Sequence, residues 1–386
     1  MTPPAIFFLV IIGIWSLLNT YVGWRLGSVP WIAAHIGPRL LATAIALLWL
    51  SYPAARLLSA RGFHGIAPPL EFVGAVWIGA LFLLFAALLT TEVLTLGGWL
   101  WPQFAPVLRG WAALAAVALA CIALVQGLRP PVVRDFEVRM PGLPAERDGL
   151  TLVVLSDLHL GALIGEGWLT ARIAQVDALH PDAVVIAGDL VDSDLDGSSA
   201  LQSVLKRLRA PLGVWAVLGN HDAYAGPERV VRFAEAADVH VLRNRAVELA
   251  PGLHLAGIDD PATLGFTGPR AAGDRRLATA LAGPRPGATI LIAHTPDART
   301  AEAAAAAGAG LMLSGHTHGG QIWPFGHLVH LRFSLFAGRY EVGGMTVLVG
   351  RGAGTWGPRM RLWRPGEILR VRLRSAATTA GAVRAT

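Results

Sequence analysis

Residues 311–322 read LMLSGHTHGGQI, an apolar run that ends abruptly in two histidines, His316 and His318, with glycine on both sides. The run LMLS has the length and composition of a buried β-strand. Two histidines at this spacing can be exposed side chains of an ordinary turn, or they can be a pair of metal ligands. The stretch alone does not separate these interpretations, so the rest of the sequence must decide between them.

Four other apolar runs end in the same way. LTLVVL leads into Asp157 and His159, DAVVIA into Asp189, GVWAVL into Asn220, and ATILIA into His294. Helical stretches separate these runs, which is typical of an α/β fold. Ligands of open sheets gather outside the carboxyl ends of the strands. We therefore expect the five loops to converge on one crevice, where flanking glycines let the backbone pass close to an ion or a phosphate.

The spacing within each motif favours shared ligation. In an extended D-x-H or H-x-H segment, residues two apart point to the same side, so both can reach one ion or two adjacent ions. The donors are nitrogen and oxygen without thiolate, a set that suits Mn, Fe or Zn. A bridging carboxylate, histidines and an amide oxygen can hold two ions about 3.5–4 Å apart. We predict that the histidines of GHTH are metal ligands.

The first third of the chain has a different composition. Before Arg129 it carries only seven charged side chains, although 32 basic and 26 acidic residues occur in the whole chain. A membrane-spanning helix needs about 20 apolar residues, and tryptophans mark the interfaces. No basic stretch precedes the first apolar segment, so we do not expect a cleaved signal peptide. The predicted transmembrane helices are Ala5–Trp24, Leu40–Leu58, Phe72–Thr91 and Trp111–Leu128.

Arginine placement predicts the orientation of these helices. Five arginines on the side of both chain ends, against three on the other, favour a cytoplasmic C-terminal part of a multi-pass protein of the bacterial inner membrane. From Arg129 onward, 27 basic residues face 24 acidic ones, a surplus of only three. Because the arginines are scattered, we do not expect a nucleic-acid partner. We expect these arginines to attract anionic lipid headgroups instead. The single Cys121 lies inside the fourth span and indicates no disulfide.

The motifs D-x-H, G-D, G-N-H-D, H and G-H-x-H, in this order, resemble those of the calcineurin-like metallophosphoesterases. The resemblance covers roughly residues 148–375. The flanking stretches GHTHGGQIWPF and VGRGAGTWGPRMRLWRPGEI look like the membrane-associated branch with YkuE- and YaeI-type phosphodiesterases. The N-terminal part resembles that of transmembrane proteins that carry this domain. The implied fold is an α/β sandwich of two mixed sheets flanked by helices, after four transmembrane helices.

The resemblance also implies roles for individual residues. Asp189 would bridge two divalent cations, and His221 would protonate or stabilise the leaving oxygen while Asp222 orients it. One cation would be held by Asp157, His159 and His318, and the other by Asn220, His294 and His316. The expected domains are a transmembrane region (1–128), a linker (129–147), the metallophosphoesterase domain (148–375) and a disordered tail (376–386).

These residues predict a metal-dependent phosphoesterase. Two cations lower the pKa of a water molecule towards about 7, and histidine can protonate an alkoxide leaving group. We expect hydrolysis of a phosphodiester or pyrophosphate bond in a lipid-linked or nucleotide substrate. The alternative is a membrane signalling or scaffold protein that binds a phosphate ligand without turnover. Asp192 and Asp297 could each accept a hydrogen bond from a ligand histidine or cap a loop.

Overall fold

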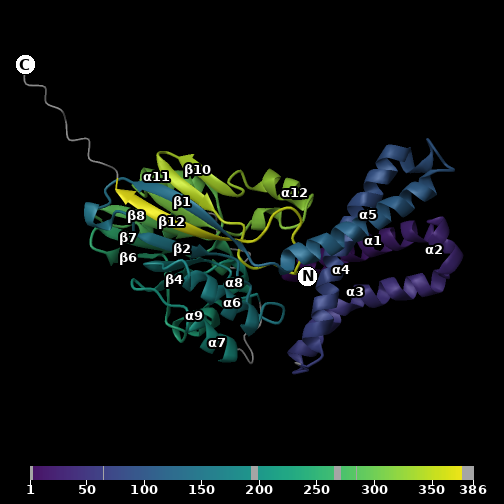
Figure 1. The fold of residues 1–386 in the computed structure, drawn as a ribbon, viewed down its shortest axis with the longest axis horizontal. Coiled ribbons are helices and arrows are strands. Elements are labelled where there is room, and N and C mark those ends of the chain that lie inside the picture. The colour runs from purple at the N-terminus through teal and green to yellow at the C-terminus, as the bar shows by residue number, and fades with distance from the viewer. Residues whose placement is uncertain (1–2, 64, 193–198, 265–270, 284, 376–386) are drawn as a thin grey trace, which may run out of the picture. The chain divides into compact units, whose positions relative to one another are not determined.

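The computed structural model describes residues 3–63, 65–192, 199–264, 271–283 and 285–375, and the chain forms two compact units (Figure 1). The helical unit contains Met1–Arg129 together with two later segments, Gln321–Trp323 and Thr355–Pro365. The α/β unit contains Pro130–Gly320, Pro324–Gly354 and Gly366–Thr386. All the candidate metal ligands belong to the α/β unit.

The helical unit is built from long apolar helices. Within the described residues, four of its helices are long and apolar enough to cross a membrane, which confirms the predicted number of spans. Pro53 does not interrupt the second span. Close to it, a Cβ on Gly74 would lie 2.6 Å from the backbone nitrogen of Tyr52, so glycine permits the approach of two helices there. The helices are α1 (Pro3–Gly27), α2 (Pro30–His35), α3 (Pro38–Ala60), α4 (Ala67–Thr95) and α5 (Ala105–Leu128).

The two later segments are part of the core of this unit. Met360 and Leu362 are fully buried in one hydrophobic cluster with Leu81 and Leu88 of α4. The backbone N–H of Arg361 donates to the carbonyl of residue 123 in α5 over 2.8 Å. These segments therefore pack as integral elements of the helical unit, although they come from the C-terminal part of the sequence.

The α/β unit contains two six-stranded mixed sheets. In the first sheet β2, β3, β4 and β5 run parallel, and in the second sheet β7, β8, β9 and β11 run parallel. The first sheet, in spatial order, is β1 (Val132–Met140), β12 (Glu367–Ser375), β2 (Thr151–Leu155), β3 (Ala183–Ala187), β4 (Val214–Val217) and β5 (Val239–Val241). The second is β10 (Gly338–Val342), β11 (Met345–Val349), β9 (Leu311–Ser314), β8 (Ala288–Ala293), β7 (Leu253–Ile258) and β6 (Arg245–Ala250).

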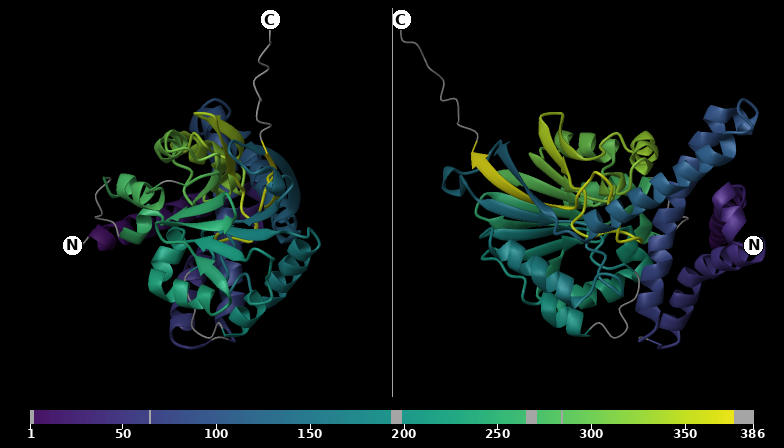
Figure 2. Two further views of the ribbon diagram at one scale, coloured as in Figure 1. Left: turned by 90° about the vertical axis from the view of Figure 1, so that its left-hand side faces the viewer. Right: turned by 45° about the vertical axis from the view of Figure 1, so that its right-hand side comes forward.

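The sheets pack face to face with helices on both outer faces (Figure 2). The central core joins valines and leucines of the first sheet, such as Val154 and Val185, to Ile290 and Leu313 of the second. This is the predicted sandwich of two mixed sheets flanked by helices. The outer helices are α6 (Glu166–Asp177), α7 (Ser199–Leu205), α8 (Asn220–Ala225), α9 (Pro227–Glu235), α10 (Ala271–Ala280), α11 (Ala298–Ala306) and α12 (Phe325–Arg332).

The expected linker contains a strand. Residues 132–140 form β1, which pairs in parallel with β12 from Val132 opposite Glu367 to Met140 opposite Ser375. The sequence VVRDFEVRM alternates apolar and polar side chains over part of its length, the pattern of a strand at the edge of a sheet. The expectation of a linker over 129–147 was therefore wrong for its central part. The predicted tail 376–386 lies outside the described residues.

Candidate metal centre

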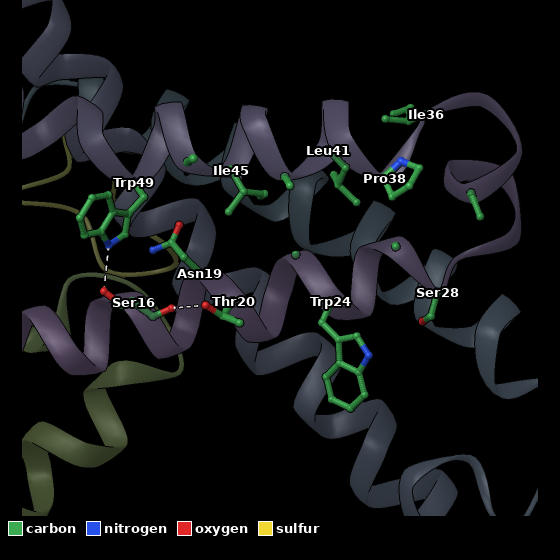
Figure 3. A pocket seen from close by; sticks show the side chains of 15 residues that line it. Ser16, Asn19, Thr20, Trp24, Ser28, Ile36, Pro38, Leu41, Ile45 and Trp49 are labelled. Atoms are coloured by element: carbon green, nitrogen blue, oxygen red, sulfur yellow. Dashed lines mark hydrogen bonds between the residues drawn. The ribbon is translucent and has the colours of Figure 1, made fainter.

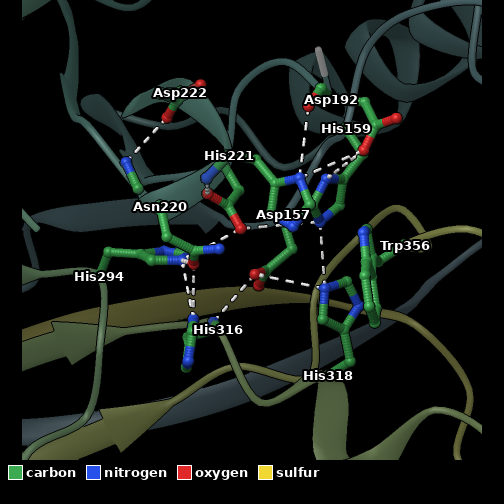
Figure 4. Close-up of polar contacts among 12 residues, drawn as sticks. Asp157, His159, Asp192, Asn220, His221, Asp222, His294, His316, His318 and Trp356 are labelled. Carbon is green, nitrogen blue, oxygen red and sulfur yellow. Dashed lines mark hydrogen bonds and ion pairs between the residues drawn. The ribbon is translucent and has the colours of Figure 1, made fainter. Parts of the chain in front are cut away.

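Five strands deliver the candidate ligands to one place. The loops after β2, β3 and β4 of the first sheet meet the loops after β8 and β9 of the second, because the carboxyl ends of these strands lie on the same side of the sandwich. Figure 4 shows their side chains pointing towards one another. The residues brought together are Asp157, His159, Asp189, Asn220, His221, His294, His316 and His318.

One group of ligand atoms contains Asp157, His159 and His318. The Nε2 atoms of His159 and His318 lie 3.1 Å apart, and Nε2 of His318 lies 3.5 Å from Oδ1 of Asp157. All three residues are buried. A single position can therefore be reached by two ring nitrogens and one carboxylate oxygen.

A second group contains Asn220, His294 and His316. Oδ1 of Asn220 lies 2.8 Å from Nδ1 of His316 and 3.2 Å from Nε2 of His294, and these two ring nitrogens are 3.3 Å from each other. The other nitrogen of His294, Nδ1, donates to the carbonyl of residue 187 over 2.8 Å, because a carbonyl oxygen can only accept, and Nε2 is directed at the group. Asp189 lies beside both groups, since its Oδ2 is 3.1 Å from His294 Nε2 and 3.8 Å from His159 Nε2.

The backbone of the ligand loops is not extended. Asp157, His159, Asp189, His316 and His318 all have positive φ values, between 48° and 72°, in the left-handed region. The expected extended D-x-H and H-x-H geometry was therefore wrong, although the side chains do converge. Left-handed non-glycine residues cost about 1–3 kcal/mol each and gather at functional sites, where the surrounding fold enforces them.

Glycine is required where the loops cross one another. A Cβ on Gly188, whose φ is 85°, would lie 2.4 Å from Nδ1 of His294, and a Cβ on Gly219 would lie 2.1 Å from Oδ1 of Asp189. Neither site can accept a larger residue without displacing a candidate ligand. The G-D and G-N motifs thus reflect close packing of backbone against the ligand side chains.

Asp222 does not orient His221. Its fully buried carboxylate accepts hydrogen bonds from three backbone N–H groups, those of Gly219 at 2.8 Å, Val191 at 3.0 Å and Leu190 at 3.2 Å. Adjacent residues of a helix such as α8 point about 100° apart, so this carboxylate turns away from the preceding imidazole. It ties the loop after β3 to the start of α8.

Among the described residues, Asp192 places a carboxylate against His221. Its Oδ1 lies 3.4 Å from Nδ1 of His221 and 3.5 Å from Nδ1 of His159 (Figure 4). The sequence left open whether this residue contacts a ligand histidine or caps a loop, and the geometry favours the contact. Asp297 behaves differently, because it caps α11 by accepting from the N–H of Thr300 at 2.9 Å.

Burial and charge oppose each other in this cluster. Burial alone would raise the pKa of Asp189, but the neighbouring His294 and His159 outweigh it and hold that pKa below its usual value. For His294, burial lowers the pKa and the charge of Asp189 raises it. The effect of Asp189 is larger, so the pKa of His294 is well above the ordinary value for histidine. Burial and the charge of Asp189 raise the pKa of Asp222 to about 6. The negative charge of Asp189 thus favours the protonated form of His294, the reverse of what burial alone would do.

The residues present fit a divalent cation. Oδ2 of Asp157 is buried and has no hydrogen-bond donor among the described residues. Two pairs of imidazole nitrogens approach to 3.1 and 3.3 Å, a distance at which two lone pairs would repel unless a proton or a cation lay between them. Imidazole nitrogens, carboxylates and an amide oxygen suit Mn, Fe or Zn.

Comparison with known proteins agrees with this geometry. The Calcineurin-like phosphoesterase family matches residues 150–320. An uncharacterized metallophosphoesterase of Campylobacter jejuni is 35% identical over 263 residues, 67% of this chain and 67% of that protein. The chain belongs to the calcineurin-like metallophosphoesterases. The matched residues 150–320 contain all the candidate metal ligands, and the chain spans about 62% of the length of the transmembrane relatives it matches.

Two further relatives are also metallophosphoesterases by name. A "Transmembrane protein with metallophosphoesterase domain" of Bos taurus is 35% identical over 279 residues, which cover 69% of this chain and 62% of that relative. The metallophosphoesterase YkuE of Bacillus subtilis is 30% identical over 263 residues, 63% of this chain and 87% of the relative. Four helices among the described residues of this metallophosphoesterase are long and apolar enough to cross a membrane, a feature in keeping with the name of the Bos taurus relative.

Proposed function

We propose that this metallophosphoesterase is a membrane-anchored two-metal enzyme that hydrolyses a phosphodiester or pyrophosphate bond. The observation that carries the proposal is the pair of ligand groups on either side of Asp189. Asp157, His159 and His318 would hold one cation, and Asn220, His294 and His316 the other. Divalent cations supply Lewis acidity to the phosphoryl oxygens and lower the pKa of a water molecule.

His221 is suited to deliver a proton to the leaving group. Its ring lies at the edge of the ligand cluster, 4.7 Å from the ring of His159 between centroids. Burial lowers its pKa, but Asp192 and Asp189 more than compensate, so that the net pKa is raised above the ordinary value for histidine. A raised pKa favours the protonated form of this imidazole, the form that a general acid requires. A site that only bound phosphate would not need this proton donor, which favours an enzyme over a scaffold.

Removing the central carboxylate tests the metal assignment. Asp189→Asn should lose both cations, because one carboxylate serves both ligand groups, and turnover of bis(p-nitrophenyl) phosphate with added Mn²⁺ should fall with the metal content. Asp297→Asn is a matched control, since an asparagine still caps α11. The metal content of both variants is measured by elemental analysis of the purified proteins. An Asp189→Asn protein with two cations and normal turnover would disprove the bridging role, and undiminished turnover after chelation would disprove metal dependence.

We also propose that the substrate is presented at a lipid surface. α12 begins seven residues after His318, and Phe333, directly after its end, packs edge-on against His316 with ring centroids 5.1 Å apart. Phe325, Leu328 and Leu331, spaced by three residues, are 42%, 59% and 85% exposed. This spacing places them along one side of the helix, and Arg332 follows at its end. A short helix with exposed apolar side chains and a basic end fits the headgroup region of a bilayer.

Polar substitutions on α12 separate a lipid-borne substrate from a soluble one. Leu328→Ser with Leu331→Ser should lower hydrolysis of a diester embedded in vesicles, and should leave hydrolysis of a soluble diester unchanged. Glu302→Gln on α11 is a control surface change. Equal turnover of the vesicle-borne substrate by the variant and the parent protein would point to soluble nucleotides instead. The arginine distribution favours a cytoplasmic catalytic unit in a bacterial inner membrane.

A further inference from the structure

A groove with a volume of about 910 Å³ runs between α1 and α3 in the helical unit (Figure 3). It extends from Ser16 and Trp49, near the middle of the two spans, to Ser28 and Pro38 at their linked ends. Its size lies at the upper end of the range for small-molecule sites, about 300–1,000 Å³. Its lining residues belong to α1, α2, α3 and their connections, and none of them belongs to the metal centre.

Small residues keep the groove open. A Cβ on Gly23 of α1 would lie 3.5 Å from the side chain of Ile45, and one on Gly27 would lie 3.6 Å from that of Leu41. These are ordinary contact distances, so an alanine would fit, but any longer side chain at either position would occupy the groove. Ala42 and Ala46 on α3 also line it.

The polar groups in the wall already bind one another. Nε1 of Trp49 donates to Oγ of Ser16 over 3.2 Å, and Oγ1 of Thr20 donates to the carbonyl of residue 16 over 2.8 Å (Figure 3). The side-chain oxygen of Asn19 accepts from Nε1 of Trp77 over 2.9 Å. With these groups satisfied internally, the middle of the groove favours hydrocarbon over water or an ion.

The outer surface of the same helices is apolar. Leu17 on α1 and Leu47 on α3 are 70% and 64% exposed, as expected for side chains that face lipid tails. An open groove in such a surface is surrounded by acyl chains. A hydrocarbon chain is therefore the ligand for which both the wall and the setting are suited.

One end of the groove carries a surplus of positive charge. Glu92 forms ion pairs with two arginines, at 3.1 Å to Arg25 and 2.6 Å to Arg109. Nη1 of Arg109 also donates to Oγ of Ser28, a groove residue, over 3.3 Å. Arg39, next to the groove residue Pro38, is exposed. Three arginines against one glutamate leave two positive charges at this end, which is complementary to an anionic headgroup.

We propose that this groove binds one acyl chain of an anionic phospholipid, with its phosphate beside Arg25 and Arg39. The site is separate from the metal centre and does not depend on the reaction catalysed there. Its physical role is to fill the space that Gly23 and Gly27 leave between two spans, and so to hold α1 against α3 through a lipid.

Photolabelling of the full-length protein tests the site. The protein is placed in phosphatidylcholine nanodiscs containing a trace of phosphatidylglycerol with a diazirine on its acyl chain, irradiated, digested and mapped by mass spectrometry. Labels should concentrate on residues 16–28 and 38–49. Labels spread evenly over all four spans would show ordinary surrounding lipid and would overturn the proposal, and this map needs no variant.

Filling the groove should displace the chain. Gly23→Phe should reduce labelling of these segments by about tenfold. Gly13→Phe is the matched control on the same helix, because a Cβ there meets no atom within 4 Å, and it should leave labelling unchanged. If Gly23→Phe does not fold, Ala42→Phe fills the groove from the opposite wall. Undiminished labelling of a folded filled variant would refute the site.

The headgroup is tested with a second probe. A phosphatidylcholine carrying the same diazirine chain should label the groove about fivefold less than the phosphatidylglycerol probe, and Arg39→Gln should reduce that difference. Equal labelling by both probes would refute the anionic headgroup.

Discussion

Asp192 is predicted to act as a positioning residue for His221. Its Oδ1 lies 3.4 Å from Nδ1 of His221, and a unit charge pair at that distance is worth at most about 5 kcal/mol at an effective dielectric constant of 20. Asparagine keeps an acceptor oxygen but removes the charge. We expect Asp192→Asn to lower kcat by roughly 10–100-fold, the range found when the hydrogen-bond partner of a metal-ligating histidine such as His159 is removed.

The same carboxylate also faces His159, at 3.5 Å from its Nδ1, so the assay must separate two routes. Asp192→Asn is measured alone and in a His221→Ala background, with the metal content determined for each protein. If Asp192 works through His221, Asp192→Asn should lower kcat by less than about threefold in the protein that already lacks that imidazole. If it works through His159, Asp192→Asn should also lose metal.

Two outcomes would refute the reasoning. If Asp192→Asn lowered kcat by the same factor in both backgrounds and left the metal content unchanged, Asp192 would act on neither histidine. Normal turnover of Asp192→Asn would show that the contact has no catalytic consequence. Asp297→Asn is the control, because its carboxylate caps α11.

The remaining predictions concern His221 and proton release. His221→Ala should retain metal yet lose roughly 10²–10⁴-fold in kcat on substrates with alkoxide leaving groups, and much less with p-nitrophenolate, which needs no proton. Equal losses on both would assign the imidazole to phosphoryl-oxygen stabilisation. Asp189 raises the pKa of His294, so the histidine must lose a proton when a cation binds. If binding releases one proton, metal affinity should therefore fall about tenfold for each pH unit below neutrality. Calorimetry in buffers of different ionisation enthalpy would show this proton, and a pH-independent affinity would contradict it.

The strand-end ligands could be predicted from sequence because their signals are local. Each apolar run is followed within a few residues by Asp, Asn or His, and parallel strands bring such loops to one edge. The spans could be predicted for the same reason, since about 20 apolar residues suffice. These features depend on short windows and on rules of topology that hold across folds.

Other features of the site depend on contacts distant in sequence. Asp192 and His221 come from the loops after β3 and β4, and their contact depends on the pairing of these strands. The left-handed backbone of Asp157 and His318 arises because the folded loops impose it against local preference. Asp222 was assigned the wrong contact, because neighbouring residues in a helix do not face each other.

The burial of Ile322, Met360 and Leu362 in the helical unit predicts how a truncated protein will behave. All seven proposed ligands follow Arg134, so the sequence suggests that a chain starting there would be an independent enzyme. In the structure these three side chains are 7%, 0% and 0% exposed within a cluster that includes Leu81 of α4. Burying each is worth about 1.5–3 kcal/mol, together roughly 5–9 kcal/mol, comparable to the stability of a whole domain.

Without the helices these side chains would face water. We expect a chain starting at Pro130, which keeps all of β1, to aggregate in size-exclusion chromatography unless detergent is present. Replacing Ile322, Met360 and Leu362 with serine in the truncated chain should restore a monodisperse peak that still holds its metals, because none of the three is a proposed ligand. A monodisperse truncated chain without these substitutions would show that the two segments do not need the helices to cover them. A substituted chain that remained aggregated would mean that the helices support the fold of the metal loops themselves.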